Sequence, residues 1–238
     1  MNDGSEELSA RVAARLRPSV TTVVAVAGPV AVGKSTLARA VADALRSRGV
    51  TSAVVSTDGF LLPNAELDER GLGARKGFPE SYDVDALRAF LGVVRDAQHR
   101  TGALSVPVYS HETYDIVPGE RRSIPPVDAL VLEGLNALSA TVGLVDLGVY
   151  VDAPLPVVEQ WYVDRFVHLC ATATPGSFYA LFAGMDSPAL EAAALSVYRA
   201  INLPNLLDHI RPSRALATVV VEKLADHGLG AITEVGQP

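Results

Sequence analysis

The stretch AGPVAVGKST at residues 27–36 decides the fold, because it joins a strand pattern to a helical pattern. Before it, VTTVVAVA at 20–27 is apolar and rich in β-branched residues, and after it STLARAVADALRSRG at 35–49 has helical spacing. The stretch itself fits G-x-x-x-x-G-K-[ST]. The sequence therefore predicts a phosphate-binding loop formed by Gly28, Val30, Ala31, Val32, Gly33, Lys34, Ser35 and Thr36.

The residues of this loop have different expected roles. Gly28 and Gly33 permit backbone angles that aim N–H groups at phosphate oxygens, and the helix that follows adds its positive dipole end. Lys34 supplies a mobile positive charge to the β and γ phosphates, and the Ser35 hydroxyl is placed for Mg²⁺. The expected cofactors are ATP and Mg²⁺.

Length and charge limit the class of protein. The 238 residues are 49% apolar, so the chain can bury a full core, and we predict one domain over residues 1–238. The net charge of −7 leaves no broad basic surface that could release counterions from DNA or RNA. We therefore expect a small-molecule substrate and no nucleic-acid partner.

The sequence also favours a cytoplasmic location. The N-terminal segment 1–19 begins with acidic residues and serine and lacks the apolar core of a secretory signal. The apolar run at 20–32 is too short to span a bilayer, so no membrane contact is expected. Cys170 is the single cysteine and suits a reducing compartment. For the oligomeric state, we consider a homodimer.

Short apolar runs alternate with helical patterns along the rest of the chain. We predict parallel strands at 51–57, 127–133, 147–153 and 217–223, and helices at 83–98, 155–170 and 188–201. This alternation predicts an α/β fold with a doubly wound, mostly parallel sheet that gathers ligands at the carboxyl ends of its strands. The long polar segment 61–83 is predicted to be a flap, and 155–205 to contain a lid and acceptor-side helices.

Two acidic residues are predicted to end strands on the same edge of the sheet as Lys34. Asp58, in STDGF, can accept the proton of an incoming hydroxyl or hold Mg²⁺. Glu133, at the end of VDALVLE, resembles the strand-end carboxylate that holds Mg²⁺ in phosphate-loop enzymes. The alternative for both residues is a structural turn, because acids before glycine are common there.

Polar and aromatic clusters favour phosphoryl transfer to a small acceptor over GTP hydrolysis. No N-K-x-D-like strand end, which would select guanine, is present. Lys76 in the flap is a second candidate for phosphate or lid contact, and a solvated loop charge is its alternative. An arginine on a helix beside the acceptor could neutralise the transferring group, although a solvated arginine on an amphipathic helix would give the same pattern. The candidate acceptor-side residues are Tyr109, His111 and Tyr114 in PVYSHETYD and Tyr162 and Arg165 in EQWYVDRF.

Eight segments in chain order closely resemble bacterial type I pantothenate kinase, in the phosphoribulokinase and uridine kinase superfamily. They are AGPVAVGKST, STDGFLLPN, RGLGARKGFPESYD, PVYSHETYD, ALVLEGLNAL, VYVDAP, WYVDRF and INLPNLLDHIRPSR. The resemblance implies a fold of the P-loop kinase type and an enzyme that moves the γ-phosphoryl group of ATP to the primary hydroxyl of pantothenate.

The resemblance also implies roles for individual residues. Lys34, Asp58 and Arg165 would be catalytic, with Asp58 as the base and Arg165 stabilising the transferring group. Ser35 and Glu133 would serve Mg²⁺. The implied pantothenate site consists of Asp58, Tyr109, His111, Tyr114, Tyr162, Arg165 and Asn205, the last taken from the two asparagines of INLPN.

The sequence departs from the family pattern in regions associated with acceptor fit and feedback by coenzyme A. Only about twenty residues precede the first strand, the stretch SATVGLVDLG is short, and VHLCATAT follows WYVDRF in place of an aromatic and basic run. Two alternatives therefore stay open beside pantothenate kinase. One is a kinase of the same fold for a nucleoside such as uridine or a sugar-like metabolite, and the other is a non-catalytic nucleotide-binding regulator.

Overall fold

A computed structural model describes residues 3–96, 102–175, 177–182 and 184–235. Its centre is a six-stranded sheet in the order β2-β5-β1-β6-β7-β8, in which the first five strands run parallel and β8 is antiparallel to β7. The α/β class and the mostly parallel sheet are thus confirmed. The strands are β1 (Thr22–Ala27), β2 (Ser52–Ser56), β5 (Ala129–Glu133), β6 (Leu147–Asp152), β7 (Val219–Lys223) and β8 (Leu229–Glu234).

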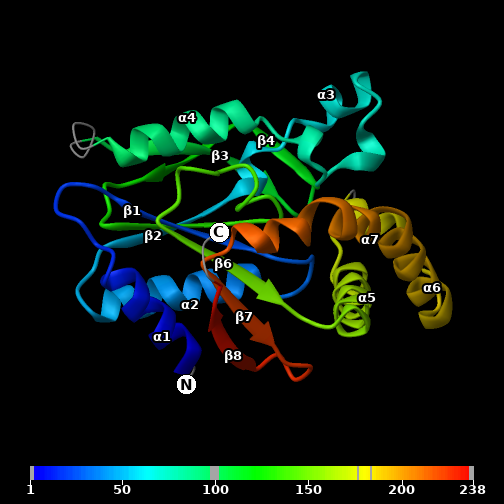
Figure 1. The fold of residues 1–238 in the computed structure, drawn as a ribbon. Helices are drawn as coiled ribbons and strands as arrows, with labels where there is room; N and C mark the ends of the chain where they lie inside the picture. Colours follow the sequence, from blue (N-terminus) through cyan, green and yellow to red (C-terminus); the bar gives the residue numbers. More distant parts are fainter. Residues whose placement is uncertain (1–2, 97–101, 176, 183, 236–238) are drawn as a thin grey trace.

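Helices cover both faces of this sheet, which explains why its central strands are apolar throughout. Every residue of β1 and β5 is buried. One face packs against α1 (Asp3–Ala13) and α2 (Lys34–Ser47), and the other packs against α4 (Val84–Arg95). Figure 1 shows these helices below and above the sheet. Two apolar cores result, one on each side of the strands.

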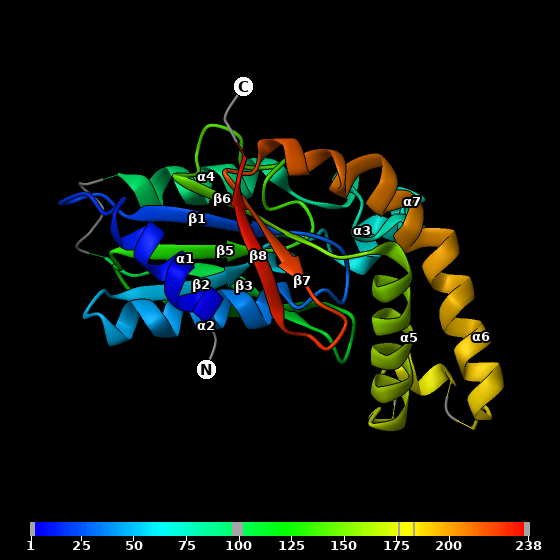
Figure 2. The same ribbon diagram turned by 60° about the horizontal axis from the view of Figure 1, so that its bottom comes forward.

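The remaining helices agree with the predicted segments within a few residues. The predicted helix 155–170 is α5 (Leu155–Ala171), and 188–201 corresponds to α6 (Ser187–Val197) followed by a π-helical turn at Tyr198–Asn202. The predicted helix 83–98 ends at Arg95, and positions 97–98 lie outside the described residues. Figure 2 shows α5 and α6 side by side.

The sequence patterns missed α1, β8 and a two-stranded hairpin. The hairpin consists of β3 (Leu104–Ser110) and β4 (Asp115–Ile124), which pair antiparallel and form a sheet of their own. The flap segment 61–83 contains α3 (Asn64–Glu69) and two short 3-10 turns. A second π-helical turn, Leu206–Ile210, follows α7 (Leu203–Asn205).

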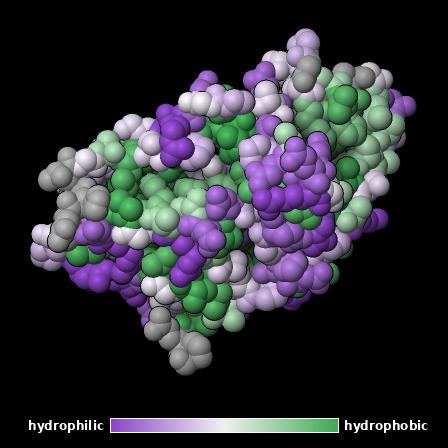
Figure 3. All heavy atoms as spheres, turned by 90° about the horizontal axis from the view of Figure 1, so that it is seen from above, coloured by the Kyte–Doolittle hydropathy of each residue, from purple (hydrophilic) through white to green (hydrophobic). Residues whose placement is uncertain are grey.

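The carboxyl ends of the parallel strands determine where a ligand can bind. In Figure 1 these ends point toward the right-hand side of the molecule, where α3, α5, α6 and α7 gather. Among the described residues, no helix is long and apolar enough to cross a membrane. The face seen from above carries hydrophilic and apolar side chains side by side, and neither kind covers it continuously (Figure 3).

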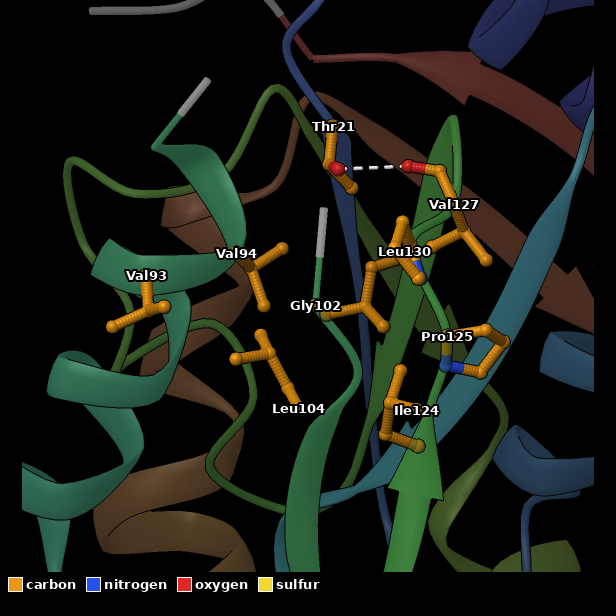
Figure 4. Close-up of a pocket in the computed structure, with 10 residues that line it drawn as sticks. Thr21, Val93, Val94, Gly102, Leu104, Ile124, Pro125, Val127 and Leu130 are labelled. Atoms are coloured by element: carbon orange, nitrogen blue, oxygen red, sulfur yellow. Dashed lines mark hydrogen bonds between the residues drawn. The ribbon is translucent and has the colours of Figure 1, made fainter. Parts of the chain in front are cut away.

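A small apolar cavity of about 20 Å³ lies at the opposite, amino-terminal end of the strands (Figure 4). Val94 of α4, Leu104 of β3 and Leu130 of β5 contribute to its wall. The hydroxyl of Thr21 donates to the carbonyl of Val127 at 2.7 Å, so it is already satisfied. A space of this size holds about one water molecule, which makes the cavity a packing gap and not a ligand site.

Candidate functional site

The phosphate-binding loop connects β1 to α2, as the sequence predicts. Gly28 has φ of 148°, and a Cβ placed there would lie 2.4 Å from the carbonyl oxygen of Val151 on β6, so a larger residue does not fit. Gly33 caps α2 in the left-handed conformation, with φ of 90°. Both positions therefore need glycine for geometric reasons. The fit between loop and β6 fixes the start of α2, whose N-terminus faces the cleft.

The predicted loop residues occupy different environments. A cleft of about 270 Å³ opens beside the loop, and Val30, Ala31, Lys34 and Ser35 line it. Val32 is buried in the core under α2, and the side chain of Thr36 is exposed on the first turn of that helix. The main chain of the loop is thus available for phosphate contact, while Val32 acts as an anchor.

Lys34 is the buried cation of the cleft. Its residue is 8% exposed, and its Nζ donates to the carbonyl oxygen of Pro29 at 2.7 Å. Burial lowers the pKa of Lys34 to about 8, although the carboxylates of Glu133 and Asp58 oppose that shift. An ammonium that is held by one carbonyl, and that faces two acids, can exchange this contact for phosphate oxygens.

The strand order explains why the two predicted acids meet Lys34. Strand β5 lies between β2 and β1, and its last residue, Glu133, is level with Val26 on one side and Ser56 on the other. Asp58 follows β2 in a 3-10 turn and is therefore beside Glu133. The carboxyl ends of three adjacent strands bring the loop and both acids to one point, as expected for this class of sheet.

Glu133 and Asp58 differ in burial. Glu133 is 7% exposed, and burial raises its pKa, while Lys34 and the hydroxyls of Ser56 and Ser35 lower it. The side chain of Asp58 is 26% exposed, and its Oδ2 lies 3.9 Å from Nε2 of His111. Asp58 is thus the acid that solvent or an acceptor can reach, and Glu133 is the one beside the loop.

The oxygen atoms near the loop fit Mg²⁺ bound together with phosphate. Mg²⁺ is usually held by one or two carboxylates plus phosphate oxygens and waters, and not by a complete protein cage. Ser35 and Glu133 offer a hydroxyl and a carboxylate close together. Within the described residues, no group of three or more His, Cys, Asp or Glu could hold a metal alone. The donor set therefore suits a metal ion that arrives with a nucleotide.

The β3–β4 hairpin supplies the aromatic wall opposite the loop. Tyr109 lies edge-on to His111, with 5.2 Å between ring centroids, and to Tyr114 at 6.2 Å. Tyr114 stacks on Phe178 with 5.0 Å between centroids. Burial raises the pKa of Tyr114 to about 12, so its phenol is a neutral hydrogen-bonding group at physiological pH. All four rings line the cleft.

Helix α5 closes the cleft from another side. Tyr162 and Arg165 both line the cleft, as predicted, and Arg165 is near enough to lower the pKa of Lys34. Burial raises the pKa of Tyr162, so its phenol also stays protonated. Arg165 makes no hydrogen bond or ion pair with another described residue, and its guanidinium is thus available to an anionic group in the cleft.

The structure brings a different asparagine of INLPN to the cleft from the one that we predicted. Asn205 is 4% exposed, and its Nδ2 donates to the carbonyl oxygen of Gly77 at 2.8 Å, outside the cleft lining. Asn202 lines the cleft and adjoins Tyr162. A π-helical turn ends at Asn202, just before α7. Asn202 is therefore a further candidate acceptor contact, and the role of Asn205 toward the acceptor stays a prediction.

Several cleft residues were missed by the sequence reasoning. Gly77 belongs to the quoted segment RKGF and Asn202 to INLPN, so both were within reach of the family resemblance. Phe178 and Tyr179 belong to a 3-10 segment with no motif, and no sequence signal pointed to them. The further lining residues without a predicted role include Leu61, Gly73, Ala74, Tyr82, Leu135, Leu169, Val197 and Ile201.

Comparisons with known proteins agree with this geometry. Residues 23–167 match the phosphoribulokinase / uridine kinase family. A protein named pantothenate kinase from Corynebacterium glutamicum (strain R) is 45% identical over 218 residues, which are 88% of this chain and 67% of that protein. Pantothenate kinase from Sorangium cellulosum (strain So ce56) is also 45% identical, over 223 residues that cover 88% of this chain and 71% of that protein.

A solved structure confirms the fold independently. D-glycerate 3-kinase from Cryptococcus neoformans var. grubii aligns with a TM-score of 0.70 at 13% identity and covers 99% of this chain and 100% of its own. At that identity the match concerns the fold alone. Together with the sequence matches, the loop, the two strand-end acids and the aromatic wall place this chain in the phosphoribulokinase / uridine kinase family.

Proposed function

We propose that this protein is an ATP-dependent pantothenate kinase. The observation that supports this proposal most strongly is the 45% identity to pantothenate kinases over most of the chain. The cleft adds chemical support, because three polar residues of the phosphate side line it together with the tyrosines of the acceptor side. These residues are Lys34, Asp58 and Arg165, and the tyrosines are Tyr109, Tyr114 and Tyr162. The proposed reaction transfers the γ-phosphoryl group of ATP to the primary hydroxyl of pantothenate and releases ADP.

Each of these cleft residues has a separate role in the proposed reaction. The backbone N–H groups of the loop bind the phosphates, and Lys34 exchanges the Pro29 carbonyl for the β and γ phosphate oxygens. Asp58 accepts the proton of the acceptor hydroxyl while the new P–O bond forms and the bond to ADP breaks. Arg165 stabilises the negative charge of the transferring group. Ser35 and Glu133 would hold Mg²⁺ together with the phosphates, and the ion would supply further charge neutralisation.

The acceptor is proposed to lie against the hairpin and α5. Tyr109, His111, Tyr114, Tyr162 and Asn202 offer hydrogen-bond donors and acceptors around an apolar wall, which suits a molecule with hydroxyl, amide and carboxylate groups. ATP as co-substrate and the free, buried Cys170 support the cytoplasmic location that we propose with this function. Size-exclusion chromatography with light scattering tests the expected homodimer.

A coupled assay of ADP release tests the proposed function directly. The acceptors are pantothenate, uridine, cytidine and several sugars at matched concentrations, with purified protein, ATP and Mg²⁺. We expect turnover with pantothenate and kcat/KM values for the other acceptors lower by orders of magnitude. Preferred turnover of uridine or of a sugar would instead identify the kinase alternative, and no turnover with any acceptor would favour the nucleotide-binding regulator.

We expect the kcat/KM for ATP to fall at alkaline pH because Lys34 loses its proton there. Because the pKa of Lys34 is lowered to about 8, its ammonium is present below that pH and is lost above it. The kcat/KM for ATP, which reports groups of the free enzyme, should therefore fall as pH rises through about 8. Lys34→Arg keeps its charge at every accessible pH. The kcat/KM of Lys34→Arg for ATP, whatever its absolute value, should not fall in this pH range. If it falls as in the wild type, a group other than Lys34 causes the decrease.

Coenzyme A is expected to inhibit this protein more weakly than its longer relatives. The residues after Phe166 are Val167, His168, Leu169 and Cys170, where the family pattern led us to expect an aromatic and basic run. Leu169 lines the cleft and Cys170 packs in the aromatic cluster of α5 and α6, so neither presents a charge to a phosphate group. Inhibition constants measured beside the Corynebacterium glutamicum enzyme test this expectation, and equal potency would contradict it.

A further inference from the structure

Lys76 lines the cleft and binds the turn of the β3–β4 hairpin. Its ammonium donates to the main-chain carbonyl of Tyr114 and to Oδ1 of Asn64. It also lies 4.9 Å from the ring centroid of Tyr114 and 5.1 Å from that of Tyr109. These distances are within the range of cation–π attraction. Lys76 of the flap thus contacts the backbone of the hairpin turn and the rings of Tyr109 and Tyr114, which belong to the aromatic wall.

Asn64 completes this connection. Its Nδ2 donates to the same carbonyl of Tyr114 at 3.2 Å, and its main-chain N–H donates to Oδ1 of Asp115 at 2.9 Å. The same Asp115 oxygen accepts from the N–H of Ile116 at 2.8 Å. Lys76, Asn64 and Asp115 therefore form one network, which we name the hairpin clamp.

The residue held by the hairpin clamp has an unfavourable backbone conformation. Tyr114 has φ of 57°, in the left-handed region that residues with a Cβ rarely adopt. A glycine or asparagine would be the ordinary choice for such a turn. Such a conformation persists where surrounding contacts determine it, and here two side-chain donors converge on the Tyr114 carbonyl. The conformation directs the Tyr114 ring onto Phe178 in the cleft.

The charges around Lys76 are consistent with a positioning role. The acids that act on Lys76 are, in order of their effect, Asp115, Asp58 and Asp68. Burial lowers the pKa of Lys76, and these acids oppose that shift. Two of the three protons of this ammonium point to protein oxygens, one on the hairpin turn and one on the flap.

We propose that Lys76 is a positioning residue for acceptor binding, which acts through the hairpin clamp by holding Tyr114 and Tyr109 in place. This inference rests on the proposed kinase function for its kinetic consequence, but the clamp itself can be observed without substrate. The expected kinetic signature is a change in the KM for pantothenate, with little change in the KM for ATP, because the hydrogen bonds of the clamp hold the hairpin turn that carries Tyr114.

Lys76→Met tests the proposal, since methionine keeps much of the apolar stem and removes the ammonium. We expect the KM for pantothenate to rise by about ten- to a hundredfold, the size expected for lost hydrogen bonds to a charged group, while the KM for ATP changes less than about threefold. Arg70→Met is the matched control. Arg70 is exposed, belongs to the same flap and, among the described residues, forms its ion pair with Glu66 alone, so both KM values should stay at the wild-type level.

A double-mutant cycle tests whether Lys76 and Asn64 act on the same group, the main-chain carbonyl of Tyr114. Asn64→Ala should raise the KM for pantothenate in the same direction, and Lys76→Met combined with Asn64→Ala should add little, because both side chains hold the same Tyr114 carbonyl. Additive effects would overturn the clamp. A main effect on the KM for ATP would do so as well, because it would identify Lys76 as a phosphate contact.

Hydrogen–deuterium exchange provides a readout that does not depend on the acceptor. In Lys76→Met, amides of residues 110–116 should exchange faster than in wild type, while those of the phosphate-binding loop should not change. Arg70→Met should match wild type in both segments. If wild-type protein does not phosphorylate pantothenate, the proposed function fails, yet the exchange data still decide the clamp. Unchanged exchange at 110–116 would overturn it.

Discussion

Lys34→Ala is expected to reduce kcat to near the background rate while the protein stays folded. Lys34 is the buried cation that faces Glu133 and Asp58 at the mouth of the phosphate-binding loop. Removing one preorganised group that stabilises developing charge typically costs about 10²–10³ in kcat. The loss should be at least that large here, because the same ammonium also positions the β and γ phosphates.

The measurement must separate catalysis from folding. Thermal unfolding establishes that Lys34→Ala is folded, isothermal titration gives its ATP affinity, and ADP release gives kcat. Arg46→Ala is the matched control: it removes an exposed cation at the other end of α2, where Arg46 pairs with Asp43. Wild-type kcat in folded Lys34→Ala would contradict the assignment of the loop to phosphoryl transfer.

Much of the site could be predicted because strand order and loop chemistry determine it together. The glycine spacing identified the loop, and parallel strands bring Asp58 and Glu133 to the same edge of the sheet as Lys34. These residues are separated by long stretches of chain, but the sheet places them side by side. Strand-end acids are thus predictable from local patterns once the fold class is known.

The acceptor side was harder to predict because its geometry depends on irregular backbone. Asn202 and Asn205 are three residues apart, and on a regular α-helix they would lie on neighbouring positions of one face. Here Asn202 lines the cleft while Asn205 is buried and holds the flap at Gly77, and π-helical turns at 198–202 and 206–210 flank the α-helical segment Leu203–Asn205 between them. Nothing in the residue types of INLPN indicates where a π-helical turn begins.

The hairpin was missed for a related reason. Strand β3 contains Pro107, which normally argues against a central strand, and β4 is mostly exposed and polar. The hairpin is held by antiparallel pairing and by Leu104, Val106 and Ile124, which pack into the apolar core on the α4 side of the sheet. Lys76 illustrates the consequence: as a charge in a polar segment it suggested phosphate or lid contact, whereas its hydrogen bonds go to Tyr114 on the hairpin turn and to Asn64 of the flap.

Asp58→Asn is expected to lower kcat by about 10²–10⁴ and to leave ATP affinity nearly unchanged, because positioned proton transfer contributes that order of rate. Asparagine keeps the size of the side chain and removes its capacity to accept a proton at neutral pH. Asp58 lies immediately after β2, is partly exposed to the cleft and acts electrostatically on Lys34, so its carboxylate is on the side from which an acceptor approaches.

The structural alternative makes an opposite prediction. If Asp58 only forms a turn before Gly59, asparagine should replace it well, since Asn-Gly is as favourable as Asp-Gly in such turns. The turn itself rests on main-chain contacts that the substitution keeps, with the Asp58 N–H donating to Oγ of Ser56 at 3.2 Å and the Leu61 N–H donating to the Asp58 carbonyl at 3.1 Å.

Kinetics therefore distinguish the base from the turn without ambiguity about folding. Asp43→Asn, the same chemical change at an exposed position of α2, should keep wild-type kcat and controls for net charge. A folded Asp58→Asn protein that binds ATP and phosphorylates its acceptor at the wild-type rate would show that Asp58 is not the base. In that case Glu133 and His111, which also line the cleft, would be the next side chains to test as the proton acceptor.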